Sequence, residues 1–459
     1  MTSTQALVET LYLHLPEGTV GAAAQAAPVN KDLQLTLQFL PALVIIVVAS
    51  GLCGRLAVLL RQPRVLGEMV AGILLGPTLF GALLPGVHAQ IFTPEVKSIL
   101  YLLGTVGLTL YMFLVGVGID HGHPSAGKSA RTVSSVAAFG IALPVLLGAG
   151  CAVAFYDSLS RPNVSVVEFA LFLGGALSIT AFPMLARIVY ERGIEHTRLG
   201  RIALLSASVD DAVAWCILAV LSAIHMGSSE HALMTIGLAA LFAVVMLFGV
   251  ARLLRPLGRR VERTGEMGWD ALFLVVALVL LSGYFTDYIG IYSVFGGFIA
   301  GAAMPRSLAF RQAIQSRMME AVSVLLLPVF FVYSGLNTNF EGFGWGGIMA
   351  FVIILAAGFI GKYVGCATAM RVTGFSWRES AAMGALMNAR GLMILIFINI
   401  GLAEGMINQT VFAILVLVAV VTTGAALPLY RWSISLGFEQ ELKSIENGGD
   451  IVPQLAIKD

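Results

Sequence analysis

Long apolar runs recur along the chain from about residue 36 to residue 433. Each run reaches roughly the 20 residues that an α-helix needs to cross a bilayer. Short polar connections separate the runs. The pattern predicts an all-α polytopic membrane protein with about thirteen transmembrane helices, at 36–60, 64–84, 97–119, 132–156, 165–192, 198–226, 231–251, 268–286, 288–304, 316–336, 345–371, 376–402 and 408–433.

Positive charge is distributed unevenly among the connections. Nearly all Lys and Arg residues between the spans follow odd-numbered spans, while the N-terminal tail and the connections after even-numbered spans hold only Lys31, Lys97 and Arg161. Loops that stay in the cytoplasm are enriched in Lys and Arg. The asymmetry therefore predicts an N-terminal tail (1–35) outside the cell and a C-terminal tail (434–459) in the cytoplasm.

Composition supports a membrane protein and adds little about partners. The chain is 58% apolar and 12% charged, against about 25% charged in soluble proteins. A formal net charge of +1 gives no reason to expect a nucleic-acid partner. The four cysteines lie in apolar segments at unrelated spacings, which predicts free thiols rather than a disulfide or a bound metal. We expect no cofactor, and a transporter rather than an enzyme.

Two parts of the sequence resemble each other. The segment FLVGVGID (113–120) closes the third span and FFVYSGLN (330–337) closes the tenth, and the second and ninth spans share an Ala-Gly pair followed by proline. The third and tenth spans begin on opposite sides of the membrane. The chain is therefore predicted to contain two inverted repeats, an arrangement found in many secondary transporters.

Two spans carry signals for a break near their middle. Pro183 in the fifth span lacks an N–H and conflicts with the carbonyl of Ile179. The twelfth span carries Asn388, Arg390 and Gly391 at the corresponding depth. Broken helices at equivalent positions of inverted halves indicate a binding site near the membrane midplane.

Four charged residues lie deep within apolar spans. These are Asp210 and Asp211 in the sixth span, Lys362 in the eleventh and Arg390 in the twelfth. An intramembrane charge costs at least about 2.5–3.5 kcal/mol and normally pairs or lines a functional cavity. Adjacent helical residues point about 100° apart, so one aspartate should face the cavity and the other a neighbouring helix. We expect Lys362 to pair with Asp210, and Arg390 to cap exposed carbonyls.

Two hydroxyl residues, Thr180 and Ser208, are further candidate ligands for a proton or cation at this site. Glu68 lies beside Arg64 near a span end and is interpreted as an interface charge. His121 and His123 are expected to be solvated loop residues.

Other functions use similar residues. The two acids could form a purely structural pair with a neighbouring cation, or belong to a channel, which requires a continuous pore. An intramembrane aspartyl protease needs acids that converge from separate helices, whereas these two are adjacent on one helix. A proton-coupled exporter of an organic ion on the same scaffold remains open, because fold does not determine substrate.

Several motifs resemble those of the monovalent cation/proton antiporter-2 family, in particular its plant and fungal cation/proton exchanger branch and their bacterial relatives. They cover nearly the whole chain apart from the tails. The motifs are RQPRVLGE (61–68) with GILLGP (72–77), ITAFPMLAR (179–187), TD (286–287) with IGI (289–291) and FG (295–296), LP (327–328) with FF (330–331) and SGL (334–336), and MNARGL (387–392).

The resemblance implies a homodimer in a bacterial inner membrane with the sodium/proton antiporter fold, in which two broken helices cross. It implies a dimerisation domain at 36–130 and 268–340, an ion-transporting core at 131–230 and 345–433, and a linker at 231–267. The transported ions would be Na⁺ or K⁺ and H⁺.

The resemblance also assigns residues. Asp211 matches the family's ion-binding aspartate, so it would hold the monovalent cation. Asp210 departs from the exchanger branch, which usually has Asn there, and is similar to the paired-aspartate sodium/proton antiporters, whose lysine partner matches Lys362. Arg390 stands where the exchanger branch often has Lys.

Overall fold

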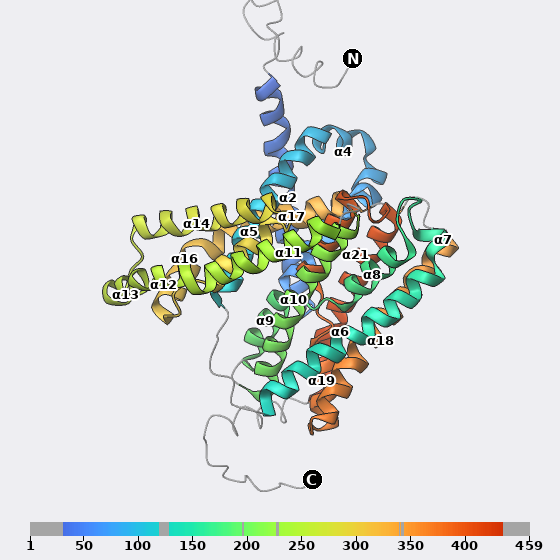
Figure 1. Ribbon diagram of the computed structural model, residues 1–459. Coiled ribbons are helices and arrows are strands. Elements are labelled where there is room, and N and C mark those ends of the chain that lie inside the picture. Colours follow the sequence, from blue (N-terminus) through green and yellow to red (C-terminus); the bar gives the residue numbers. More distant parts are fainter. Residues whose placement is uncertain are drawn as a thin grey trace, which may run out of the picture.

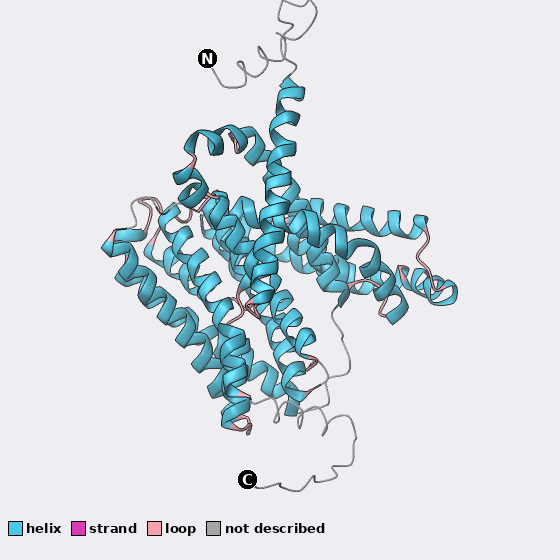
Figure 2. Cartoon of the chain, turned by 180° about the vertical axis from the view of Figure 1, so that it is seen from behind, coloured by secondary structure: helices cyan, strands magenta, loops and turns pink. Residues whose placement is uncertain are grey.

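The structure is a computed structural model, which describes residues 31–118, 128–194, 197–225, 229–338, 340 and 344–434. Within these ranges the chain is helical with short loops and contains no strand (Figure 2). The N-terminal tail before residue 31, His121 and His123, and the C-terminal tail after residue 434 lie outside the described residues. The all-α polytopic class predicted from the apolar runs is confirmed.

The number of spans differs from the expected thirteen. Among the described residues, eleven helices are long and apolar enough to cross a membrane, or twelve if the bent pair at 377–403 is one span. The segment expected at 288–304 contains only a ten-residue helix, α15 (Ser293–Ala302). A helix of that length rises about 15 Å, half the hydrocarbon thickness. Residues Gly290 and Tyr292 have left-handed backbone and form a turn, so the helix begins only after them.

Helices pack into two groups; in Figure 1, α6, α8 and α18 of one group lie at the right, and α14 and α16 of the other lie at the left. In the first group, α6 packs on α8, α10 and α18, and α19 packs on α18 and α21. Its members are α6 (Lys128–Ala154), α7 (Tyr156–Leu159), α8 (Val166–Ser178), α9 (Phe182–Arg192), α10 (Arg198–His225), α18 (Trp345–Val372), α19 (Trp377–Leu386), α20 (Gly391–Ala403) and α21 (Gln409–Ser433). We call this group the core bundle.

In the second group, α3 packs on α2 and α17, and α5 packs on α15 and α17. We call it the scaffold bundle. Its members are α2 (Lys31–Leu59), α3 (Arg64–Leu75), the π-helical turn η1 (Pro77–Gly81), α4 (Pro85–Ile91), α5 (Pro94–Gly118), α14 (Trp269–Tyr288), α15 (Ser293–Ala302), α16 (Leu308–Ala321), the π-helical turn η3 (Val322–Leu326) and α17 (Leu327–Leu336).

A third stretch joins the two bundles. It packs on α10 at one end and on α15 and α16 at the other. Its elements are α11 (Ser229–Val244), the π-helical turn η2 (Val245–Val250), α12 (Ala251–Leu253) and α13 (Arg255–Thr264). Only 11% of the most apolar part of its span is buried in protein, against 89% for the broken span of α8 and α9. The broken span is therefore far more enclosed by its neighbours than the joining stretch.

Glycines let the scaffold helices approach each other at backbone distance. A Cβ added at Gly335 on α17 would lie 2.0 Å from the carbonyl carbon of Gly72 on α3. A Cβ at Gly72 would lie 2.3 Å from the carbonyl oxygen of Phe331. Small residues at such crossings are the usual means of close helix packing in membranes. Both glycines belong to the repeated sequence motifs, Gly335 to FFVYSGLN (330–337) and Gly72 to the Ala-Gly pair of the second span.

We predict that Gly335→Ala destabilises the protein, because the added methyl group overlaps α3 backbone that cannot move aside. Overpacking of this kind costs about 1–3 kcal/mol. The matched control is Gly150→Ala on α6, where an added Cβ meets no atom within 4 Å. The thermal midpoint of purified protein in detergent should fall for Gly335→Ala and stay or rise slightly for Gly150→Ala. Equal midpoints for the two variants would contradict the crossing.

Candidate functional site

Two helix breaks form the centre of the core bundle. The first separates α8, which ends at Ser178, from α9, which begins at Phe182, with extended backbone at Ile179 and Ala181. Pro183 lies in the first turn of α9, where a missing N–H costs nothing. The second break separates α19 from α20 with a 42° bend, and Gly391 there has φ +43°. Both breaks were predicted from the sequence.

The two breaks are joined by hydrogen bonds. The backbone N–H of Ala181 donates to the carbonyl of Ala389 at 2.9 Å. The Thr180 hydroxyl donates to the carbonyl of Met387, also at 2.9 Å. Unwound backbone is tolerated at membrane depth only where it is buried in protein or lines a water-filled cavity. Each break therefore supplies carbonyl or N–H partners to the other.

Thr423 on α21 also supports the second break, and sequence reasoning missed it. Its hydroxyl accepts hydrogen bonds from the backbone N–H groups of Arg390 (3.3 Å) and Gly391 (3.0 Å), at the start of α20. These N–H groups have no partner inside their own helix. The signal in the sequence was the Thr422-Thr423 pair within an apolar span.

Lys362 and Asp210 form a fully buried ion pair. The Lys362 Nζ lies 2.5 Å from Asp210 Oδ2 and 2.5 Å from the carbonyl oxygen of Ser178, and both side chains have no exposed surface. A buried ion pair is tolerated when hydrogen bonds satisfy its remaining groups. The pairing of Lys362 with Asp210 that the sequence predicted is present in the structure.

The Arg390 side chain is likewise fully buried, and the hydrogen bonds described for it go only to backbone carbonyls. Its Nη1 donates to the carbonyls of Ala176 (3.3 Å) and Leu177, and its Nη2 donates to that of Gly358 at 2.6 Å. The carbonyls at the end of α8 have no helical partners and carry partial negative charge. Together with Lys362, which binds the Ser178 carbonyl, Arg390 neutralises this helix end as expected.

Asp211 differs from Asp210 because no described residue forms a hydrogen bond with its carboxylate. It is 1% exposed, and neither carboxylate oxygen accepts a hydrogen bond from the described residues. The backbone N–H of Phe182, at the positive N-terminal end of α9, faces it without reaching hydrogen-bond geometry. Asp210 Oδ1 is also unpartnered within the described chain. Three carboxylate oxygens are therefore available at the break for a ligand.

The remaining predicted residues contribute unequally. The Asn388 side chain donates to the Gly384 carbonyl at 2.9 Å, and its buried Oδ1 accepts no hydrogen bond from the described residues. The Ser208 hydroxyl donates to the carbonyl of Leu205 on its own helix at 2.9 Å. Ser208 lies three positions before Asp211, so the two share a face of α10. Its role as a ligand stays a prediction, because Asp211 accepts no hydrogen bond from the described residues.

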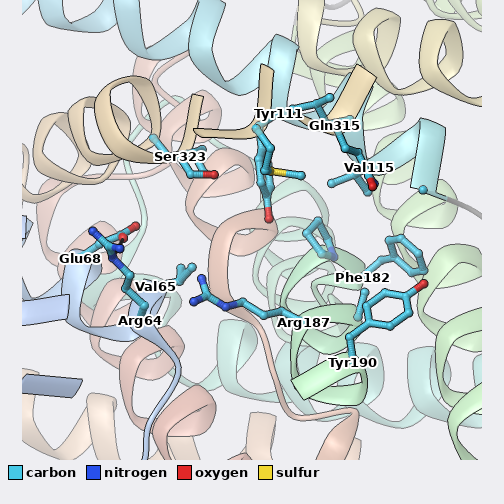
Figure 3. A pocket seen from close by; sticks show the side chains of 16 residues that line it. Arg64, Val65, Glu68, Tyr111, Val115, Phe182, Arg187, Tyr190, Gln315 and Ser323 are labelled. Carbon is cyan, nitrogen blue, oxygen red and sulfur yellow. Dashed lines mark ion pairs between the residues drawn. The ribbon is translucent and has the colours of Figure 1, made fainter. Parts of the chain in front are cut away.

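A cavity of about 430 Å³ reaches the first break, and Arg64 and Arg187 are in its lining (Figure 3). We call the side of the molecule on which it lies the basic side. The core bundle contributes Phe182, Pro183, Arg187 and Tyr190, and the facing wall comes from the scaffold bundle. Glu68 lines this cavity and is 4% exposed, 3.3 Å from Arg64, so it is a buried cavity acid as well as an interface charge.

Comparison with known proteins identifies relatives along nearly the whole chain. Residues 43–430 match the family model described as "Sodium/hydrogen exchanger, transmembrane". The chain is 36% identical over 405 residues to the Na⁺/H⁺ antiporter NhaS4 of Synechocystis sp., covering 87% of this chain and 97% of that protein. It is also 36% identical over 375 residues to cation/H⁺ antiporter 17 of Arabidopsis thaliana, covering 81% of this chain and 45% of that longer protein.

The fold has a counterpart among solved structures. The sodium proton antiporter MjNhaP1 from Methanocaldococcus jannaschii superposes with a TM-score of 0.65 at 15% sequence identity, covering 89% of this chain and 99% of that one. The two proteins share a fold.

We predict that Asp210 and Lys362 are strongly coupled in stability. Lys362→Met alone leaves the carboxylate buried without its cation, and Asp210→Asn alone leaves the ammonium without its anion. Each single change should cost about 3–5 kcal/mol, while the double variant should recover much of that loss. Thermal midpoints of the purified proteins test this. Asp211→Asn is the control, since the Asp211 carboxylate accepts no hydrogen bond from the described residues. Additive losses in the double variant would contradict the coupling.

Proposed function

This chain belongs to the sodium/hydrogen exchanger family, and we propose that Asp211 is the site at which it exchanges a monovalent cation, Na⁺ or K⁺, for protons. Membership makes the chain a multi-pass membrane transporter and a monovalent cation/proton antiporter. The observation that carries the assignment of Asp211 is its buried, unpartnered carboxylate at the crossing of two broken helices.

The chemistry of exchange follows from that carboxylate. A proton and a dehydrated cation compete for the same oxygens, so binding of one requires release of the other. Asp210 Oδ1 and the hydroxyl oxygen of Thr180 lie close enough to the break to complete an oxygen shell, the type of ligand that hard cations prefer. Lys362 and Arg390 hold the carbonyl ends of α8 and so fix the shape of this shell.

Alternating access requires that the site open to each side in turn. The breaks belong to the core bundle, and the cavity lies between that bundle and the scaffold bundle. We infer that the core (131–230 and 345–433) moves as a unit against the scaffold (36–130 and 268–340), with the stretch at 231–267 as its link. The scaffold would hold two copies of the chain together as a homodimer.

The basic side supports an orientation. Loops rich in Arg stay in the cytoplasm, so the basic side would face the cytoplasm of a bacterium, with the protein in the inner membrane, surrounded by lipid, and its N-terminus outside. The described conformation would then be inward-facing, because its cavity reaches the break from that side.

We predict that Asp211→Asn abolishes cation-driven proton movement in proteoliposomes while the protein stays folded. Neutralising an unpartnered charge at the midplane removes a cost rather than adding one. Asp157→Asn, the same change at an exposed position of α7, is the control and should transport normally. The assignment is wrong if Asp211→Asn vesicles respond to Na⁺ and K⁺ at the rate of the unmodified protein.

We predict in addition that the exchange is electrogenic. A cation that binds Asp211 and Asp210 weakens the contact of Asp210 with Lys362, whose ammonium then loses its anion and releases a second proton. Net charge then crosses the field, which is worth about 2.3 kcal/mol per elementary charge per 100 mV. Proteoliposomes clamped with valinomycin and K⁺, with Na⁺ as substrate, test this. Exchange rates indifferent to the imposed potential would mean that Lys362 keeps its proton and that exchange is one-for-one.

A further inference from the structure

The two bundles are in direct contact on the side opposite the cavity, which we call the closed side. The rings of Trp215 on α10 and Phe295 on α15 lie 6.1 Å apart. Asn399 on α20 donates to the Ser334 hydroxyl on α17 at 2.9 Å. Both contacts join the core bundle to the scaffold bundle. The route from this side to Asp211 opens only if they separate.

Glu404 makes another polar contact across this boundary. This residue follows the last turn of α20, where unpaired carbonyls carry partial negative charge and disfavour a carboxylate. Its carboxylate accepts hydrogen bonds from the Ser222 hydroxyl on α10, at 2.8 and 3.0 Å, and from the Tyr292 hydroxyl. Ser222 belongs to the core bundle and moves with Glu404, whereas Tyr292 belongs to the scaffold bundle.

Tyr292 reaches Glu404 from an unusual backbone conformation. Its φ is +69°, in the left-handed region that side chains other than glycine rarely adopt, and it directly precedes α15. Such a conformation persists only where the surrounding contacts enforce it, and it often marks a functional element. Gly290, with φ +86°, makes the preceding bend. The loop between α14 and α15 therefore holds the tyrosine against the core.

We propose that the hydrogen bond from Tyr292 to Glu404 is a latch that holds the closed side shut while the cavity is open on the basic side. The proposal rests on the proposed movement of the core against the scaffold. The contact joins the two moving parts, so it stabilises the described conformation and must break when Asp211 turns to the other side. A contact made in only one of two states shifts the equilibrium towards that state.

The latch also explains why a carboxylate stands at this helix end. A hydrogen bond to a charged group is stronger than one between neutral groups, and its loss upon opening is offset because Glu404 then meets water. The bond is therefore strong enough to bias the equilibrium and still breakable in each cycle. Its removal should raise the ratio of outward-open to inward-open molecules about tenfold, which corresponds to about 1.4 kcal/mol.

The test uses Tyr292→Phe, which removes only the hydroxyl group. Tyr288→Phe is the matched control, because Tyr288 ends α14 nearby, is 79% exposed and stacks on Tyr284 rather than on the core bundle. A cysteine introduced as Phe295→Cys, in protein whose four native cysteines are replaced by alanine, reports opening. A membrane-impermeant maleimide is added to proteoliposomes from the closed side.

The expected result is that labelling accelerates about tenfold in Tyr292→Phe and is unchanged in Tyr288→Phe. Glu404→Gln keeps the side-chain shape, removes the charge, and should accelerate labelling in the same direction, so it carries the test if Tyr292→Phe does not fold. Unchanged or slower labelling in folded Tyr292→Phe, or equal acceleration by both tyrosine variants, overturns the latch.

Labelling reports opening without any need for transport. A failure of the Asp211 assignment in the flux assay therefore leaves this experiment valid. Conversely, a failed latch would leave Asp211 as the exchange site.

Discussion

The need to satisfy a broken helix inside the membrane determines most of this structure. The carbonyls that end α8 find no partner within their own helix, and Arg390 and Lys362 satisfy them from two other helices. The N–H groups that begin α20 are satisfied by Thr423. These bonds require α8, α18, α20 and α21 to meet at one place, because hydrocarbon offers no alternative partner. The core bundle follows from that requirement.

The role of Asp211 depends on the fact that neither Lys362 nor Arg390 binds its carboxylate. Lys362 is engaged by Asp210 and the Ser178 carbonyl, and Arg390 is engaged by backbone carbonyls, so neither cation reaches the second aspartate. A buried acid without a partner is expensive in a static structure. The free-energy cost of burying this acid is offset if a proton and a transported cation bind it in turn. The cavity is the route by which these ions reach it.

The two faces of the boundary between bundles have opposite character. On the basic side the bundles stand apart around a cavity with Glu68 and Arg187 in its lining. On the closed side aromatic, amide and carboxylate contacts join them. Alternating access needs two states of similar free energy, so a few hydrogen bonds on one face suffice to set their balance. Contacts far from Asp211 therefore contribute to how readily it meets each side.

The sequence by itself determined the all-α membrane class and both helix breaks, because apolar length and proline chemistry act locally. It also determined the charged residues at the midplane and the partner of Asp210, because the cost of buried charge leaves few options for pairing. The helix length predicted for the segment 288–304 was too great, because a tight turn at Gly290 and Tyr292 shortens the helix. Only the tertiary structure decided that Thr423 completes a break and that Glu404 meets Tyr292. These contacts join residues far apart in the sequence, and no spacing along one helix encodes where two bundles touch.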